Sequence, residues 1–385
     1  MSVTAAAGFR ASGATAGLKP SGKPDVALVV NDGPRRDAAA VFTANRCKAN
    51  PVLWSEQVIA DGRLAVVVLN SGGANCYTGP DGFQTTHASA ELVAELIGAG
   101  PIDIAVCSTG LIGEHLDRGK LASGIRRAAE VLATGGGPAA AEAIMTTDTR
   151  PKQATVAGDG WVVGGMAKGA GMLAPALATM LVVLTTDAVA DAATLDRALR
   201  HATGVTFDRL DTDGCMSTND TVVLMSSGAS GIAPSEGELT EAVTRSCADL
   251  ARQLWSDAEG AHHEIAITVV NAAGEDDALT AARSVARSNL FKCAVFGGDP
   301  NWGRVLAAIG TTDAAFDPAA VDVAMNGIWV CRDGGAGPAE PRDKVDLSGR
   351  DVTVTIDLKA GHAEATILTT DLTHDYVHEN SAYST

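Results

Sequence analysis

Hydrophobic positions along this chain gather in short dense runs, and between the runs they recur with the spacing of an amphipathic helix. The dense runs are rich in Val, Ile and Leu, which is typical of buried β-strands. We expect strands within residues 26–31, 63–73, 102–110, 154–167, 179–187, 264–270, 321–331 and 351–372. In the last run, Ala360-Gly361 predicts the turn of a hairpin.

Alanine-rich stretches with helical periodicity lie between these runs. They predict helices near 83–98, 116–133, 191–203, 236–258 and 276–289. Ser235 and Asp277 are residues of the type that opens such helices, and the glycine-rich stretches 133–143 and 330–344 are predicted loops. Because some strands follow one another directly and others are separated by helices, the pattern favours a mixed α+β fold with antiparallel sheet over a pure doubly wound fold.

An uncharged segment, residues 169–186, has the length of a membrane-spanning helix but lacks its composition. Glycines, a proline and a threonine interrupt its apolar surface, and only residues 180–184 form a dense hydrophobic block. The segment is therefore predicted to be a loop that leads into a short buried strand, with Thr179 at the junction.

Charge and cysteine content narrow the class of protein. The 29 Lys and Arg against 46 Asp and Glu give a net charge of −17, and no basic block stands out, so neither nucleic acid nor an anionic membrane is an expected partner. The 7 cysteines are scattered and form no C-x-x-C motif, and the first residues lack the pattern of a secretory signal. We therefore expect a cytoplasmic protein without a metal site, and none of the common phosphate-loop, serine-hydrolase or zinc-protease motifs is matched.

The junction at Thr179 suggests a chemical role. A threonine hydroxyl is a weak nucleophile and needs a base. Cutting the chain between Ala178 and Thr179 would free an α-amine, with a pKa of about 8, that can accept the proton of the hydroxyl on the same residue. Taken alone, the pattern also fits a threonine that simply opens a buried strand.

Eight segments carry a resemblance that extends over nearly the whole chain. They are "VLNSGGANCYTG" (68–79), "VCSTGLIG" (106–113), "AIMTTDTRPK" (143–152), "GGMAKGAGMLAPALATMLVVLTTDA" (164–188), "DGCMSTNDT" (213–221), "DAEGAHHE" (257–264), "FGGDPNWGR" (296–304) and "YVHENSAYST" (376–385). In content and order they resemble the motifs of the glutamate N-acetyltransferase/ornithine acetyltransferase family.

The resemblance implies a self-cleaving protein with an N-terminal nucleophile. Cleavage of the Ala178–Thr179 bond would give an α chain, 1–178, and a β chain, 179–385, that together form one intertwined catalytic unit. The implied fold is a layered α+β sandwich of mixed and antiparallel sheets with helices, similar to ornithine acetyltransferase and DmpA. The family's assembly implies an α2β2 heterotetramer.

The resemblance also implies the roles of individual residues. Thr179 would be the nucleophile, and Thr109 with Gly110 would form the oxyanion hole. The implied substrate-binding residues are Thr147, Lys168, Thr179, Glu259, Asn380 and Thr385, with Thr146 as the other candidate for the contact of Thr147. The cation of Lys168 suits an amino-acid carboxylate, and the anion of Glu259 suits the ammonium group of ornithine.

The implied reaction is the transfer of an acetyl group from N-acetylornithine to glutamate, by a ping-pong mechanism through an acyl-threonine, in the cyclic arginine pathway. No metal or organic cofactor is expected, and the sequence leaves open whether acetyl-CoA is a second acetyl donor. Two alternatives also stay open. One is an N-terminal-nucleophile amidohydrolase or aminopeptidase, and the other is an uncleaved, non-catalytic protein that binds acetylated amino acids.

Overall fold

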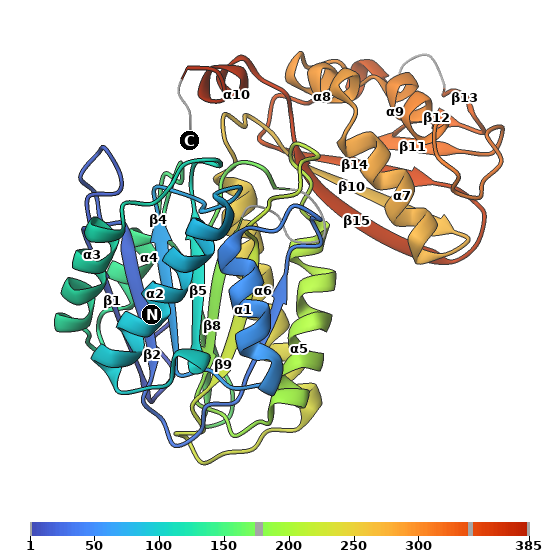
Figure 1. Ribbon diagram of the computed structural model, residues 1–385. Helices are drawn as coiled ribbons and strands as arrows, with labels where there is room; N and C mark the ends of the chain where they lie inside the picture. Colours follow the sequence, from blue (N-terminus) through green and yellow to red (C-terminus); the bar gives the residue numbers. More distant parts are fainter. Residues whose placement is uncertain (1, 174–179, 338–341, 383–385) are drawn as a thin grey trace. The chain divides into compact units, whose positions relative to one another are not determined.

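The computed structural model describes residues 2–173, 180–337 and 342–382. These residues form two compact units (Figure 1). Of the described residues, the first unit comprises those up to Asp208 together with Cys215–Asp257, and the second comprises Arg209–Gly214 and those from Ala258 to residue 382. The predicted cleavage site, Ala178–Thr179, and the predicted binding residue Thr385 lie outside the described residues.

The first unit contains a four-stranded and a five-stranded sheet. The four-stranded sheet has the order β1 (Phe9–Ala14), β2 (Val26–Asn31), β4 (Val66–Ser71), β5 (Ile104–Thr109). The five-stranded sheet has the order β3 (Ala38–Phe42), β9 (Thr221–Ser226), β8 (Leu181–Thr186), β7 (Val162–Lys168), β6 (Lys152–Ala157). Neighbouring strands are antiparallel except for the parallel pairs β4–β5 and β8–β9. Both sheets are therefore mixed.

Most helices of this unit cover the outer faces of the two sheets, whereas one, residues 137–143, packs against strands of both sheets (Figure 1). The helices of this unit are α1 (Asn50–Val58), α2 (Gly79–Ile97), α3 (Arg118–Glu130), α4 (Gly137–Ala143), α5 (Ala192–Val205) and α6 (Glu236–Ser256). One hydrophobic core contains side chains of both sheets, for example Val29 from β2 and Val183 from β8. Strands with a sheet on one side and helices on the other are buried on both faces, which is why β2, β4, β5, β8 and β9 are continuous hydrophobic runs.

The second unit contains one six-stranded sheet. Its order is β13 (Gly335–Ala336), β12 (Ile328–Arg332), β11 (Asp322–Met325), β14 (Asp351–Asp357), β10 (Glu264–Ala272), β15 (Ala363–Thr370). Helices α7 (Glu275–Ala286), α8 (Asn289–Phe296) and α9 (Trp302–Ile309) contribute to its core, and α10 (His374–Glu379) follows the last strand. Buried residues alternate with less buried ones along β10 and β14, as expected for a sheet with one covered face.

The α+β class with layered, mixed sheets is confirmed, but several local predictions are wrong. The run 351–372 forms no hairpin, because β10 lies between β14 and β15 and pairs with both. The predicted loop 133–143 contains α4, and the start of the predicted loop 330–344 belongs to the paired strands β12 and β13. The run 154–167 does contain strand, as predicted, in the form of the antiparallel pair β6–β7.

The two predicted helix-opening residues differ in outcome. Ser235 is the N-cap of α6, where its hydroxyl accepts a hydrogen bond from the amide of Glu238 and the Glu238 carboxylate accepts one from the Ser235 amide. Asp277 lies inside the first turn of α7, whose N-cap is Gly274. Three acidic residues in that first turn interact favourably with the positive end of the helix dipole. Asp277 therefore stabilises the start of the helix without capping it.

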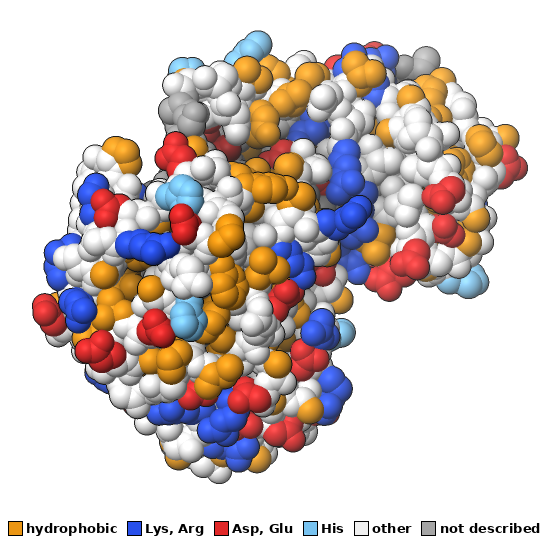
Figure 2. Space-filling model, viewed as in Figure 1, with side chains coloured by type: hydrophobic (Ala, Val, Ile, Leu, Met, Phe, Trp, Pro, Cys, Tyr) orange, Lys and Arg blue, Asp and Glu red, His pale blue; other side chains and the backbone are white. Residues whose placement is uncertain are grey.

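Among the described residues, no helix combines the length and apolar composition that a bilayer crossing requires. Acidic and basic side chains are interspersed over the face of the first unit that Figure 2 shows.

Candidate active site

The end of strand β5 carries the predicted oxyanion-hole pair. Every residue from Ile104 to Thr109 is buried, and the strand is held by its parallel pairing with β4. Gly110 follows with φ at +128°, and a Cβ at this position would lie 2.4 Å from the amide nitrogen of Gly73. That amide donates a hydrogen bond of 2.9 Å to the carbonyl of Thr109. The backbone at this strand end is therefore fixed against a neighbouring loop at a distance that only glycine permits.

Lys168, the last residue of β7, lies beside the Thr109 hydroxyl. Its ammonium Nζ donates a hydrogen bond of 3.1 Å to Thr109 Oγ1, although 59 residues separate the two in sequence. Lys168 is only 2% exposed. A buried ammonium group requires compensating polar partners, since desolvation of an unpaired charge is costly.

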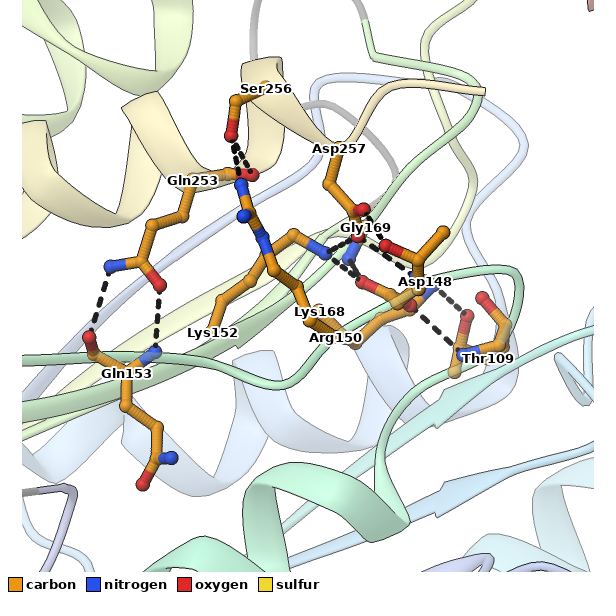
Figure 3. A network of polar contacts seen from close by, with 12 residues as sticks. Thr109, Asp148, Arg150, Lys152, Gln153, Lys168, Gly169, Gln253, Ser256 and Asp257 are labelled. Atoms are coloured by element: carbon orange, nitrogen blue, oxygen red, sulfur yellow. Dashed lines mark hydrogen bonds and ion pairs between the residues drawn. The ribbon is translucent and has the colours of Figure 1, made fainter. Parts of the chain in front are cut away.

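Asp148 is the centre of a buried network of charges next to Lys168 (Figure 3). Its Oδ1 accepts hydrogen bonds from Lys152 Nζ at 2.6 Å and from the amide of Gly169 at 2.7 Å. Its Oδ2 accepts one from the amide of Thr146 at 3.0 Å. Burial alone would raise the pKa of Asp148, but the charges of Lys168 and Lys152 and the Gly169 amide outweigh it and lower that pKa. Asp148 is therefore a carboxylate at neutral pH.

The network continues from Lys152 to Asp257. Lys152 is completely buried, and its Nζ lies 2.6 Å from Asp257 Oδ2. Asp257 also accepts a hydrogen bond of 3.0 Å from the amide of Thr149. Thr147, the predicted substrate contact, is half-buried in the loop that these bonds hold, next to Asp148.

The predicted nucleophile Thr179 and its neighbour Ala178 lie outside the described residues, but the chain that follows them is well anchored. The amide of Met180 donates a hydrogen bond of 3.0 Å to Asp220 Oδ1, and Leu181 pairs with Lys168 across β8 and β7. Asp220 is buried, and this desolvation raises its pKa well above the usual value.

Asn219 connects the same loop to the end of β5. Its Nδ2 donates hydrogen bonds to the carbonyls of Ala74, at 2.7 Å, and Ser108, at 2.9 Å. Ser108 immediately precedes Thr109. The "STNDT" segment therefore holds both the start of β8 and the end of β5, which carries the predicted oxyanion-hole pair.

Two other predicted binding residues lie in the second unit. Asn380 ends α10, and its Nδ2 donates a hydrogen bond of 3.0 Å to Glu259 Oε2. Burial, followed by the charges of Glu259 and Asp375, raises the pKa of Glu379 beside this pair. The structure thus brings Glu259 and Asn380 together in one unit and Thr109, Thr147 and Lys168 together in the other.

Sequence reasoning did not identify Asp148, Lys152, Asn219, Asp220 and Asp257. All five lie in segments that carry the family resemblance, which was the available signal. Their polar side chains are buried, and burial of such groups is a property that a local pattern does not show. Within the described ranges, no group of three or more His, Cys, Asp or Glu residues is arranged to hold a metal ion.

The end of β5 combines a threonine hydroxyl with a tightly held glycine, and a buried ammonium group donates a hydrogen bond to that hydroxyl. Groups of this kind can stabilise a developing oxyanion. These features and the layered α+β fold are consistent with an acyltransferase, the class that the family match below shows. The chain belongs to the ArgJ family, whose family model matches residues 10–385.

Individual relatives align over the whole chain. The arginine biosynthesis bifunctional protein ArgJ of Streptomyces coelicolor is 63% identical over 384 residues, and that of Thermobifida fusca is 61% identical over 385 residues. Each alignment covers 100% of both chains. Among solved structures, ornithine acetyltransferase from Mycobacterium tuberculosis, complexed with ornithine, is 53% identical with a TM-score of 0.45, and the match covers 47% of this chain and 96% of that chain.

Proposed function

We propose that this chain is a glutamate N-acetyltransferase of arginine biosynthesis, which moves the acetyl group of N-acetylornithine to glutamate through an acyl-enzyme on Thr179. One observation carries the proposal most directly, the contact of 3.1 Å between Lys168 and Thr109 at the end of β5. The pairing of Leu181 with Lys168 brings the start of β8 to the same place. The names of the full-length relatives support the assignment to arginine biosynthesis.

The first half-reaction follows from the chemistry of an N-terminal threonine. After cleavage of the Ala178–Thr179 bond, the α-amine of Thr179 accepts the hydroxyl proton while the hydroxyl oxygen attacks the acetyl carbonyl. The Thr109 hydroxyl and the Gly110 amide donate to the oxyanion of the tetrahedral intermediate, each typically worth about 2.7–4 kcal/mol. Ornithine leaves with a proton, and the acetyl group stays on Thr179.

In the second half-reaction the neutral amino group of glutamate attacks the acyl-threonine and gives a proton to the α-amine of Thr179, while the same donors stabilise the second oxyanion. The bond between the acetyl carbon and the Thr179 oxygen then breaks, and that oxygen takes the proton back as a free hydroxyl. Lys168 supplies a cation for a substrate carboxylate, and Thr147 lies in the adjacent loop. Glu259, with Asn380 bonded to it, supplies an anion for the side-chain ammonium of ornithine. Thr385 completes the proposed set of binding residues.

Acetyl-CoA is proposed as a second acetyl donor, because the relatives are named bifunctional proteins. The same oxyanion hole can receive the acetyl group of a thioester, and no further cofactor is required. The seven cysteines are free thiols, which supports a reducing cytoplasm as the compartment. We also propose an α2β2 assembly of the two cleaved chains.

The test is an assay of the purified chain with N-acetylornithine, in the presence and absence of glutamate. We expect ornithine to be released rapidly only with glutamate, and N-acetylglutamate to form in equal amount. Release of ornithine and acetate at the same rate without glutamate would indicate an amidohydrolase instead. Acetyl-CoA with glutamate as the only substrates tests the second donor, and binding without turnover would indicate a non-catalytic protein.

A further inference from the structure

The hydrogen bond between Lys168 and Thr109 has a fixed direction. An ammonium group has only donors, so Lys168 Nζ must donate and Thr109 Oγ1 must accept. The proton of the Thr109 hydroxyl is then directed away from Lys168 and is available to another acceptor. Lys168 therefore prepares Thr109 to donate, which is the polarity that an oxyanion hole requires.

Lys168 can have this effect only while it is charged and held in place. It is 2% exposed, and the charge of Asp148, itself only 7% exposed, acts on it, as does that of the buried Asp220. Asp148 holds the backbone directly after Lys168 through the Gly169 amide at 2.7 Å. The same oxygen accepts Lys152 Nζ, which Asp257 holds from its other side (Figure 3). Two ammonium groups and two carboxylates thus lie together in the interior of the first unit.

We propose that Asp148 is a positioning residue of the oxyanion hole, which holds Lys168 oriented so that Lys168 keeps the Thr109 hydroxyl as a donor. The inference rests on the proposed function, in which Thr109 stabilises the oxyanion. Asp148 acts through two other residues and contacts no reacting atom. Its loss should therefore reduce kcat more than it changes KM for glutamate, because the oxyanion forms only during the reaction.

Asp187 offers a matched control. It is 6% exposed, close to the value for Asp148, and it too accepts hydrogen bonds from backbone amides, those of Ala7 at 3.0 Å and Val162 at 2.8 Å. It follows the opposite end of the same two strands, since β7 ends at Lys168 and β8 ends at Thr186. Asp187→Asn therefore removes a buried carboxylate of the same unit without touching Lys168 or Thr109.

The experiment is a double-mutant cycle on acetyl transfer from N-acetylornithine to glutamate, with kcat divided by the cleaved fraction of each preparation. Thr109→Val is expected to reduce kcat by about 10²–10³-fold, the usual effect of losing one oxyanion-hole donor. Asp148→Asn is expected to reduce kcat by about tenfold or more in the wild-type background, and by less than about twofold in the Thr109→Val background, because residues acting through one another are not additive. Asp187→Asn is expected to keep kcat.

The outcomes separate the inference from the proposed function. Equal losses from Asp148→Asn in both backgrounds would show that Asp148 supports the fold generally, and an unchanged kcat would show no role, so either result overturns the inference. If Asp148→Asn does not fold, Asp148→Glu enters the same cycle, since it keeps the charge but displaces it by one methylene. A wild-type chain that transfers no acetyl group overturns the proposed function itself.

Discussion

Gly110 shows how much depends on the absence of a single side chain. Its φ of +128° is unfavourable for other residues, and a Cβ would meet the backbone of Gly73 at 2.4 Å and of Gly72 at 2.9 Å. We expect Gly110→Ala to displace the strand end and reduce kcat by about 10²-fold or more, as for loss of an oxyanion donor. Steady-state kinetics with thermal unfolding measures both effects.

Gly113→Ala is the control for that substitution. Gly113 also has a positive φ, 88°, but a Cβ there would meet nothing within 4 Å. It therefore carries the backbone strain without the steric clash. Equal losses of activity in the two variants would contradict the role given to close packing at Gly110.

Lys19 provides a pH-dependent prediction. It is half-buried and donates a hydrogen bond of 2.8 Å to the carbonyl of Pro24. Burial lowers the pKa of Lys19 to about 8. The attraction of Asp25 opposes burial, and smaller effects come from the charges of Lys168, Asp148 and Lys23.

The unfolded chain, with a lysine pKa of about 10.4, binds more protons than the folded chain between about pH 8 and 10.4. This group therefore makes folding more favourable as the pH rises through that window. Lys19→Met lacks this pH-dependent gain in the free energy of unfolding. The free energy of unfolding of the variant minus that of the wild type should therefore be highest near pH 7 and decline toward pH 10. Denaturant unfolding of both proteins across this range measures the difference, and a constant difference would be the contrary result.

At the scale of single elements, local pattern predicts well where periodicity is strong and the ends are marked. The helix predicted at 236–258 is α6 (Glu236–Ser256), and its capping box begins at the predicted Ser235. α4 was missed because glycines precede it, although Pro138 occupies a first-turn position that favours a helix start. The hairpin predicted in 351–372 is wrong for a different reason. The strand that separates β14 from β15 comes from residues 264–272, and no pattern within 351–372 indicates an insertion from so far away.

In the candidate site too, local pattern does not show which distant residues come into contact. Thr109, Thr147 and Lys168 were predicted from the resemblance, whereas their mutual geometry required the structure. Lys152 and Asp257 are 105 residues apart in sequence, and the network depends on the fold bringing them together. Buried charges are rare in protein interiors, so a polar residue in a sequence is normally assigned to the surface. Only their positions in the fold show that these lysines and aspartates are paired.

At the scale of the whole molecule, the predicted cut would divide one sheet between two polypeptides. β3, β6 and β7 precede Thr179, whereas β8 and β9 follow it, and β8 pairs with β7 while β9 pairs with β3. We expect mass spectrometry under denaturing conditions to give two pieces of roughly 18 and 21 kDa from the 39.1 kDa chain, the larger beginning at Thr179. Under native conditions they should elute together in size-exclusion chromatography.

Thr179→Ala is the control, since it removes the hydroxyl that is proposed to attack the preceding carbonyl. It should remain one intact chain of the same native size. An intact wild-type chain with full transferase activity would contradict the proposed N-terminal nucleophile. Separation of the two pieces without denaturant would contradict the role of the shared sheet in holding them.

The position of β10 between β14 and β15 also sets a condition on biosynthesis. During translation β10 emerges well before either neighbour, and both of its edges lack partners until residues 351–370 have been made. Unpaired strand edges are templates for association with other chains. The nascent second unit therefore passes through an interval in which β10, an interior strand of its sheet, is exposed to aggregation, and the interval closes only when residues 351–370 have left the ribosome.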